Sequence, residues 1–203
     1  MNEVLLVPTG VANTASVTAA FARIGVAVRT SVCADELQRA PAVVLPGVGA
    51  FAAGMQRLSE LGLADVLADR VREGRGTLCV CLGMQLCCEA SEESPGVRGL
   101  SVVPGVVRAF PPEVRSPQMG WNRVTPLGAP WCEEGSAYFA NSYRLVDAPR
   151  GWSVALTDHG GTFVSALRRG AAWLCQFHPE ISGRLGESFL RAFLQSCEQE
   201  VPC

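Results

Sequence analysis

Cys81, His178 and Glu180 are three residues of this chain whose types together could perform nucleophilic catalysis. Cys81 follows a short apolar run at 77–80, which we predict to be a buried strand, and is followed by Gly83 and a helical pattern. A strand that turns abruptly into a helix presents its junction side chain at the end of the sheet. The first N–H groups of that helix favour a thiolate. The pattern indicates a nucleophile elbow with cysteine as the nucleophile, the alternative being a buried structural cysteine.

The chain has two histidines, so the base for such a nucleophile has two candidates. His178 ends an apolar strand expected at 172–177, and strand alternation places Gln176, His178 and Glu180 on one side. A carboxylate two residues beyond an imidazole can accept its N–H and fix the tautomer. The alternative for this residue is a salt-bridged surface histidine. His159 lies in an Asp-His-Gly-Gly hairpin turn, where we expect a solvent-exposed tip and no catalytic role.

A glycine-rich turn, Pro-Gly-Val-Gly at 46–49, follows a strand expected at 42–45. Two glycines that bracket one valine free the backbone to point N–H groups outward. In a parallel sheet, ligands gather outside the carboxyl ends of the strands, and both this turn and Cys81 lie at such ends. An ordinary strand-to-helix turn is the alternative interpretation.

The elements that must position these residues follow an α/β pattern. Short apolar strands alternate with helices in the first half, and this alternation predicts a parallel sheet covered on both faces. Beyond about Leu100, prolines punctuate short β-like runs, which favours antiparallel strands and hairpins. We predict a three-layer, doubly wound, mostly parallel sheet with additional antiparallel strands in the C-terminal half, in one domain over 1–203. The expected segments are strands at 4–7, 26–28, 42–45 and 77–80, helices at 15–24 and 185–197, and one or two helices over 51–72.

Composition excludes several classes of function. The net charge of −2 gives no electrostatic reason to expect nucleic acid or an anionic membrane as a partner. All 17 basic residues are arginine, which excludes a Walker A or Schiff-base lysine. Nine cysteines without a signal peptide indicate a reducing, cytoplasmic location. An odd cysteine count without a C-x-x-C pair argues against a disulfide framework and a zinc site, and we expect no metal or cofactor.

Three motifs together resemble class I, triad-type glutamine amidotransferases: Cys-Leu-Gly-Met-Gln at 81–85, Pro-Gly-Val-Gly at 46–49 and Gln-Phe-His-Pro-Glu at 176–180. Met-Gly-Trp-Asn at 119–122 and Gly-Val-Ala-Asn at 10–13 narrow the resemblance to glutaminase subunits of imidazole glycerol phosphate synthases. The resemblance covers nearly the whole chain, with the motifs in order and at the spacing of that family.

The resemblance implies hydrolysis of the side-chain amide of L-glutamine without a cofactor. Cys81 would attack the amide carbon. His178 would take the thiol proton and give one to the leaving ammonia, and Glu180 would orient His178. Backbone N–H groups of Leu82 and, after a peptide flip, of Val48 would hold the oxyanion. We also expect such a flip to gate the reaction, so that the hole assembles only when the partner is loaded.

The resemblance further implies a glutamine site and a protein partner. Residues at the family's glutamine-binding positions are Gly47, Gly49, Gln85, Ser142 and Tyr143. Ammonia would pass through a channel to a (β/α)8 cyclase subunit in a heterodimer, which makes imidazole glycerol phosphate and an aminoimidazole carboxamide ribotide for histidine biosynthesis. Asn13, Trp121 and Asn122 match partner-facing positions.

Three residues depart from the family pattern. Cys79 stands where glycine is usual, Asn141 where histidine is common, and Pro8 where an acidic residue often follows the first strand. Two alternatives therefore stay open. One is a paralogous glutaminase that supplies ammonia to a different synthase, such as a sugar-amidating enzyme. The other is a catalytically silent regulatory or binding subunit that keeps the fold.

Overall fold

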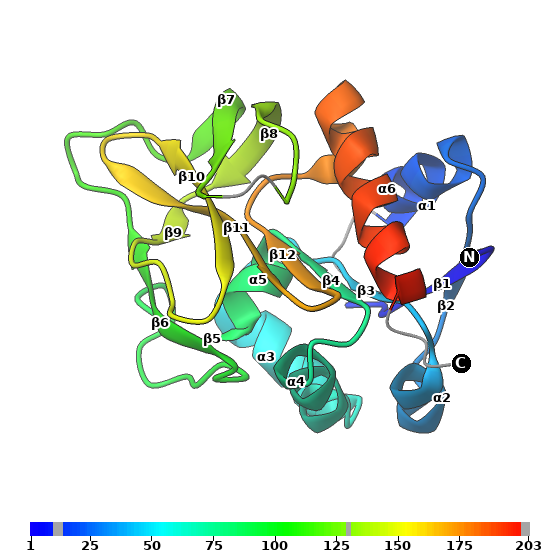
Figure 1. Cartoon of the computed structure of the whole chain (residues 1–203). Helices are drawn as coiled ribbons and strands as arrows, with labels where there is room; N and C mark the ends of the chain where they lie inside the picture. Colours follow the sequence, from blue (N-terminus) through cyan, green and yellow to red (C-terminus); the bar gives the residue numbers. More distant parts are fainter. Residues whose placement is uncertain (10–13, 129–130, 200–203) are drawn as a thin grey trace.

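The first half of the chain builds the parallel part of the sheet (Figure 1). The computed structural model describes residues 1–9, 14–128 and 131–199. Strand β12 joins the strands of this half, in the parallel order β2-β1-β3-β4-β12. The elements are β1 Glu3–Leu6, α1 Thr14–Arg23, β2 Ala27–Thr30, α2 Ala34–Arg39, β3 Val43–Leu45, α3 Phe51–Glu60, α4 Ala64–Arg72 and β4 Thr77–Val80.

The second half continues the sheet with antiparallel strands in the order β12-β11-β10-β7-β8. Strand β5 pairs with β6 in parallel, and β9 pairs with β6 and β11 in antiparallel fashion. The elements are α5 Leu82–Leu86, β5 Cys88–Ser91, β6 Val103–Ala109, β7 Gln118–Pro126, β8 Gly135–Asn141, β9 Tyr143–Leu145, β10 Ser153–Asp158, β11 Thr162–Arg169, β12 Ala172–Cys175, the 3-10 turn η1 Pro179–Ile181 and α6 Gly183–Gln199.

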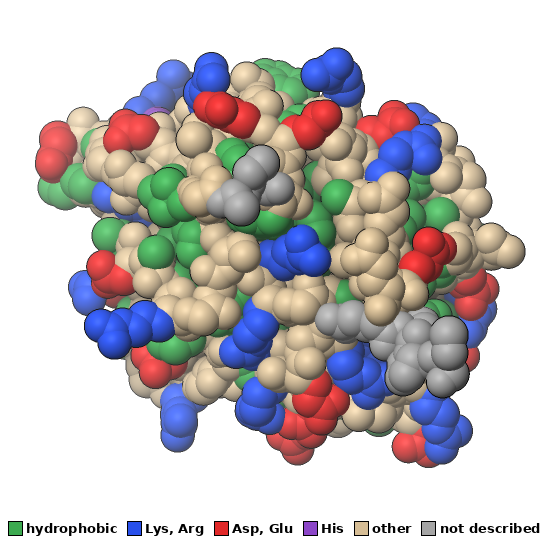
Figure 2. Space-filling view, in the orientation of Figure 1, with side chains coloured by type: hydrophobic (Ala, Val, Ile, Leu, Met, Phe, Trp, Pro, Cys, Tyr) green, Lys and Arg blue, Asp and Glu red, His purple; other side chains and the backbone are tan. Residues whose placement is uncertain are grey.

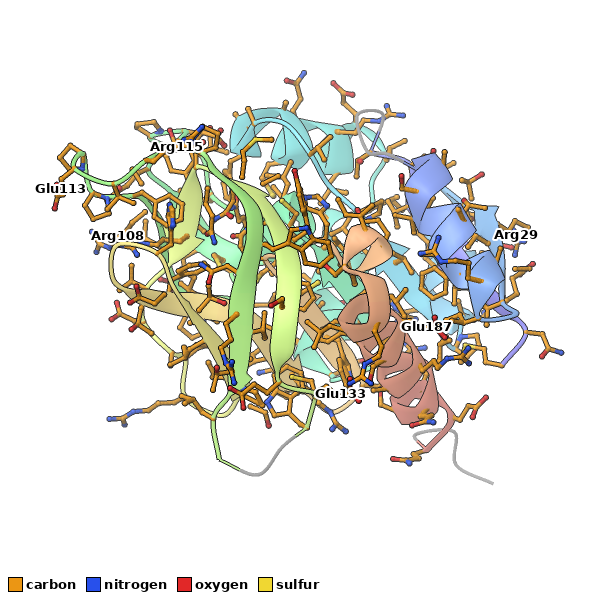
Figure 3. All side chains as sticks on the ribbon, turned by 90° about the horizontal axis from the view of Figure 1, so that it is seen from above. Arg29, Arg108, Glu113, Arg115, Glu133 and Glu187 are labelled. Carbon is orange, nitrogen blue, oxygen red and sulfur yellow. The ribbon has the colours of Figure 1, made fainter. Side chains whose placement is uncertain are left out.

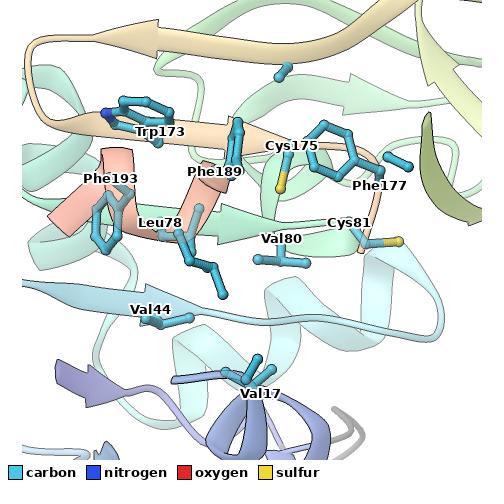
Figure 4. Close-up of a cluster of buried hydrophobic side chains, with 14 of the residues drawn as sticks. Val17, Val44, Leu78, Val80, Cys81, Trp173, Cys175, Phe177, Phe189 and Phe193 are labelled. Atoms are coloured by element: carbon cyan, nitrogen blue, oxygen red, sulfur yellow. The ribbon is translucent and has the colours of Figure 1, made fainter. Parts of the chain in front are cut away.

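Two apolar cores cover the two faces of the sheet because strand residues alternate between them. In β1, Val4 and Leu6 face α1 and α6, whereas Leu5 faces the opposite core with α2, α3, α4 and α5. Figure 4 shows part of the first core, where Phe189 and Phe193 of α6 pack beside Trp173 of β12. This arrangement confirms the predicted α/β fold with helices on both faces.

Several predicted boundaries differ from the structure. The segment 51–72, for which the sequence predicts one or two helices, forms two, α3 and α4, separated at Gly62, whose φ of +66° ends the first. The helix after Cys81 ends at Leu86, and the following residues join β5, where Cys88 pairs with Val103 of β6. Local periodicity does not report this pairing because its partner strand lies about fifteen residues further along the chain.

Arg70 is a fully buried cation that joins three elements on the face of α2 and α4. Its guanidinium donates hydrogen bonds to the main-chain oxygens of Leu37, Gln38, Ala40 and Gly76, and to the hydroxyl of Thr77. Burial lowers the pKa of Arg70 to about 10, so the side chain is charged at neutral pH. The guanidinium thereby supplies the hydrogen-bond donors that water would otherwise provide to the carbonyl groups at the end of α2 and the start of β4.

Charges of both signs are interspersed on the surface that Figure 2 draws. Exposed ion pairs include Arg29 with Glu3 at 3.3 Å and Arg108 with Glu92 at 3.2 Å, and the two arginines lie at opposite edges in Figure 3. Exposed pairs of this kind contribute about 0–1 kcal/mol each, so they do not position the site. Among the described residues, no helix has the length and apolar character needed to cross a membrane.

Candidate active site

Cys81 occupies a strained junction between β4 and α5. Its φ of 53° and ψ of −108° lie in a region that non-glycine residues rarely adopt and that costs of order 1–3 kcal/mol. Gly83 makes the turn possible, because a Cβ at that position would lie 2.3 Å from the main-chain oxygen of Leu45. Figure 4 shows the sulfur of Cys81 beyond the end of β4, pointing away from Val80. The local geometry is that of the predicted nucleophile elbow.

The sheet brings His178 next to Cys81 because β4 and β12 are parallel neighbours. Cys175 pairs with Val80, and the N–H of Cys81 donates to the main-chain oxygen of Cys175 at 2.7 Å. The chain then leaves β12 and reaches His178 three residues later, directly before η1. His178 Nδ1 lies 2.8 Å from Glu180 Oε1, and both side chains are more than 90% buried. Cysteine, imidazole and carboxylate therefore meet at one end of the sheet.

The surroundings of His178 favour its charged form. Burial lowers the pKa of the ring, but hydrogen bonds to Cys81 and Glu180, with the charges of both, raise the pKa of His178 to about 10. The hydrogen bond to Glu180 uses Nδ1, which leaves Nε2 for the sulfur. An imidazolium beside a sulfur favours a negatively charged sulfur. The ring thus has a sulfur on one side and a carboxylate on the other, an arrangement that is chemically suited to nucleophilic catalysis.

The glycine-rich turn lies directly against the elbow. The N–H of Leu82, one of the predicted oxyanion donors, donates to the main-chain oxygen of Gly47 at 3.3 Å. A Cβ on Gly47 would lie 2.8 Å from both the nitrogen of Gly83 and the Cβ of Leu82, so only glycine permits this approach. Gly49 has a φ of +95°. In this conformation the Gly47–Val48 peptide presents its oxygen, and not its N–H, to the elbow.

A cavity of about 280 Å³ opens beside the sulfur of Cys81. Of the predicted glutamine-binding residues, Gly49, Gln85, Ser142 and Tyr143 line it, whereas Gly47 packs beneath the elbow and does not. Gln85 Nε2 donates to the main-chain oxygen of Tyr143 at 3.1 Å. The complete lining is Val48, Gly49, Cys81, Leu82, Gln85, Glu93, Ala140, Asn141, Ser142, Tyr143 and His178.

Glu93 lines this cavity and was not among the residues predicted from the sequence. Its Oε2 accepts a hydrogen bond from the N–H of Phe51 at 2.6 Å, and its own N–H donates to Ser91 Oγ at 3.2 Å. The carboxylate is therefore held at the start of α3 with one side toward the cavity. The sequence contains only a polar Ser-Glu-Glu-Ser loop here, which does not distinguish a surface turn from a cavity wall.

The three departures from the family pattern have different local surroundings. Cys79 is fully buried on the face of β4 opposite Val80, with its sulfur 3.7 Å from that of Cys87, as expected for a residue within the strand. Asn141 Nδ2 donates to the main-chain oxygen of Tyr143 at 3.0 Å. Pro8 is half-buried just beyond β1.

The predicted partner-facing residues fall into three situations. Trp121 is 60% exposed and packs edge-to-face on Tyr138, with ring centroids 6.0 Å apart. Asn122 donates through Nδ2 to the main-chain oxygen of Asp158 at 2.7 Å. Asn13 lies outside the described residues.

His159 is not among the residues that line this cavity. It lies in the turn between β10 and β11, where Nε2 is 2.9 Å from the main-chain oxygen of Arg115 and the ring packs edge-on against Phe110. The predicted exposed tip is wrong in detail, since these contacts leave the residue half-buried. The described residues contain no group of three His, Cys, Asp or Glu side chains placed to hold a metal ion.

Comparison with known proteins defines first the class of protein. A family model described as "Glutamine amidotransferase class-I" matches residues 5–197. The solved structure "Crystal structure of glutamine amidotransferase" superposes with a TM-score of 0.77, covering 96% of this chain and 98% of that chain at 19% identity. A second solved structure, "Structure of PurLQS from Thermotoga maritima", gives a TM-score of 0.66 at 15% identity, covering 99% of both chains. These superpositions show the fold.

The sequence relatives narrow the class. Imidazole glycerol phosphate synthase subunit HisH of Deinococcus radiodurans is 41% identical, covering 94% of this chain and 92% of the relative. The protein of the same name from Xylella fastidiosa (strain 9a5c) is 42% identical over 96% and 98%. "Imidazole glycerol phosphate synthase hisHF, chloroplastic" of Arabidopsis thaliana is 36% identical over 94% of this chain but only 34% of the relative. The chain belongs to the HisH family of class-I glutamine amidotransferases.

Proposed function

We propose that this chain is the glutaminase subunit of an imidazole glycerol phosphate synthase and that Cys81, His178 and Glu180 hydrolyse L-glutamine to glutamate and ammonia. The observation that carries the proposal is the placement of His178, hydrogen-bonded to Glu180 on one side and to Cys81 on the other, beside a cavity. Each group matches its role in nucleophilic acyl transfer.

The chemistry follows from the protonation of His178. The sulfur of Cys81 attacks the side-chain amide carbon of glutamine, and His178 gives its proton to the nitrogen as the carbon–nitrogen bond breaks, which releases ammonia. A water molecule then attacks the thioester while His178 accepts a proton from it. The carbon–sulfur bond breaks, glutamate leaves, and the starting charges are restored. Glu180 holds the ring at Nδ1 through both steps.

The oxyanion hole is the element that we propose to be gated. Leu82 cannot stabilise an oxyanion while its N–H is engaged by Gly47. Rotation of the Gly47–Val48 peptide would withdraw that oxygen and present the N–H of Val48, so that two donors face the same point. This is a two-state element that a loaded partner could bias. If the isolated chain hydrolysed glutamine as fast as the loaded complex, gating would be refuted.

Charge complementarity supports glutamine as the substrate. Glutamine carries an α-ammonium group. Among the described residues that line the cavity, Glu93 is the one with a carboxylate side chain. We propose that Glu93 binds this ammonium group, while Gln85, Ser142 and Tyr143 surround the rest of the molecule. A substrate held there by its α-carbon end would place its side-chain amide toward Cys81.

An exposed apolar surface beside the site supports a protein partner. Met119, Trp121 and Ile181 are 66%, 60% and 44% exposed, and Ile181 directly follows Glu180. The hisHF relative extends well beyond the part that this chain matches. We propose that a (β/α)8 cyclase subunit covers this surface in a heterodimer and receives the ammonia through a channel.

The test uses Cys81→Ala and Cys81→Ser in the complex with such a cyclase subunit. Both variants are expected to lose glutamine-dependent synthesis and to retain synthesis from added ammonia, because only the sulfur is removed. Loss of both activities would indicate structural failure. His159→Gln, which replaces the histidine that does not line the cavity, is the control and should retain both activities. A folded wild-type complex that releases no ammonia from glutamine would favour the catalytically silent subunit. Activity with a different synthase would favour the paralogous glutaminase.

A further inference from the structure

Two buried amide side chains connect the main chain at the substrate cavity to the nucleophile. Gln85 Nε2 donates both to the main-chain oxygen of Tyr143, at 3.1 Å, and to Gln176 Oε1, at 2.9 Å. Gln176 Nε2 in turn donates to the sulfur of Cys81 at 3.6 Å. Gln176 is fully buried and Gln85 nearly so, which shields these contacts from water.

The main-chain oxygen of Tyr143 fixes the donor–acceptor direction of these hydrogen bonds. A main-chain carbonyl oxygen can only accept, so the end of Gln85 that faces Tyr143 must be its NH₂ group. The second hydrogen of the same nitrogen requires an acceptor, which makes the facing atom of Gln176 its oxygen. The other end of Gln176, which faces the sulfur, must then be its NH₂ group. The polarity at Cys81 therefore follows from a main-chain atom in β9.

The backbone holds Gln176 in this position. Gln176 directly follows β12, and its N–H donates to the main-chain oxygen of Ser165 in β11 at 2.9 Å. A reversed amide would place two oxygens, or two NH₂ groups, against each other at Gln85 and would lose both ordered contacts. A sulfur that faces an obligate donor is better stabilised as a thiolate than as a thiol, because hydrogen bonds to an ion are the stronger ones.

We propose that Gln176 is a further catalytic residue, whose Nε2–H donates to the sulfur of Cys81 and stabilises it as the attacking thiolate. The inference rests on the proposed function, in which Cys81 is the nucleophile. The sulfur then has two hydrogen-bond donors from the segment 176–180, the imidazolium of His178 and the side-chain amide of Gln176. It also connects Gln85, a wall of the substrate cavity, to the reacting atom through one intervening side chain.

The test measures how fast iodoacetamide alkylates Cys81 as a function of pH in the full-length chain, read by mass spectrometry of the peptide that carries it. Gln176→Met removes both polar ends at nearly the same volume. Gln176→Glu keeps an oxygen toward Gln85 but places a carboxylate oxygen at the sulfur. We expect Gln176→Met to slow the alkylation of Cys81 at pH 7 about tenfold and to move the inflection of its pH–rate profile to higher pH. Gln176→Glu should slow the alkylation more than Gln176→Met does. Ser165→Ala, which keeps the main-chain oxygen, is the matched control and should change neither.

Alkylation of the exposed Cys33 in the same samples reports the activity of the reagent, and a thermal melt identifies a variant that fails to fold. Unchanged Cys81 profiles in folded Gln176→Met and Gln176→Glu would overturn the proposal, because a residue that only fills space would leave thiolate formation unaltered. Failure of the proposed function is distinguishable from this result. It would appear as absent glutamine hydrolysis by the wild-type complex, whatever the alkylation profiles of the variants.

Discussion

The protonation of His178 offers a direct test of how the site is built. Three substitutions separate the influences on the ring: Cys81→Ala removes the sulfur, Glu180→Gln removes the carboxylate charge, and the double variant removes both. Each leaves the burial of the imidazole in place. The chain has only two histidines, so the ring signals of His178 can be assigned with a single His159→Gln substitution.

The magnitude follows from the surroundings of His178. A rise of the pKa from 6.5 to about 10 corresponds to a preference of about 5 kcal/mol for the imidazolium. Burial is the largest single influence and acts in the opposite direction, so Cys81 and Glu180 together must outweigh it, with the hydrogen bond to Cys81 the larger of the two. We therefore expect Cys81→Ala to lower the pKa more than Glu180→Gln does. The double variant should fall below 6.5, because burial is then unopposed.

The assay is an NMR titration of the imidazole carbon-bound protons and ring nitrogens between pH 5 and 10.5. In the wild-type chain the signals of His178 should show no inflection between pH 6 and 8.5 and should begin to change only as the pH approaches 10. An inflection near pH 6.5 in the wild-type chain would refute the reasoning. A double variant with the wild-type inflection would refute it equally, since neither partner would then be setting the charge of the ring.

Three further substitutions test the positioning of the site. Gly83→Ala should abolish glutamine hydrolysis, because its Cβ would lie 2.3 Å from the main-chain oxygen of Leu45; the glutaminase rate in the complex checks this. Arg70→Met should lower the free energy of unfolding by about 3 kcal/mol or more in urea titrations, since it leaves buried carbonyl groups without a donor, whereas Arg72→Met on the surface should change it by about 0.5 kcal/mol or less. Glu93→Gln keeps an acceptor for α3 but loses the charge, so KM for glutamine should rise about tenfold to a hundredfold with a smaller change in kcat.

Two neighbouring substitutions serve as controls for these results. Gly54→Ala introduces a Cβ whose nearest atoms are the side-chain methyl groups of Leu86, at 3.0 Å, and these can adjust. This variant should keep its glutaminase rate in the complex. Glu92→Gln alters the exposed carboxylate that precedes Glu93 in the sequence. Glu92 accepts hydrogen bonds from Arg108 and from the N–H of Ala109 outside the cavity. An equal rise of KM in both glutamate variants would contradict a specific contact between Glu93 and the substrate.

The sequence was sufficient for features that depend on local pattern. Apolar runs ending at Cys81 and His178 predicted two strands, and both strands end within two residues of the expected positions. Gly83, two residues after Cys81, marked the junction at which the strand turns into a helix. What local pattern could not supply were relations across the sheet. That Glu93 reaches the cavity depends on its contact with the start of α3, forty-two residues earlier.

Hydrogen-bond direction was equally invisible in the sequence. Gln176 was placed on the correct side of its strand by alternation, yet its donor to Cys81 is determined by Gln85 and by a main-chain oxygen of β9. The engaged state of the Leu82 N–H likewise depends on the orientation of one peptide in a glycine-rich turn. Glycine permits either orientation, so residue types alone do not choose between them.

The insertion of β12 between β4 and β11 has a consequence for biosynthesis of the chain. Cys81 is synthesised almost a hundred residues before His178, and β12, which leads to His178, also joins the two halves of the sheet. A truncated product that ends before residue 170 would carry a thiol with no base and a sheet with its central strand missing. With the proposed roles of Cys81 and His178, ammonia release would begin only once translation has passed the last strand, and unfinished chains would not consume glutamine.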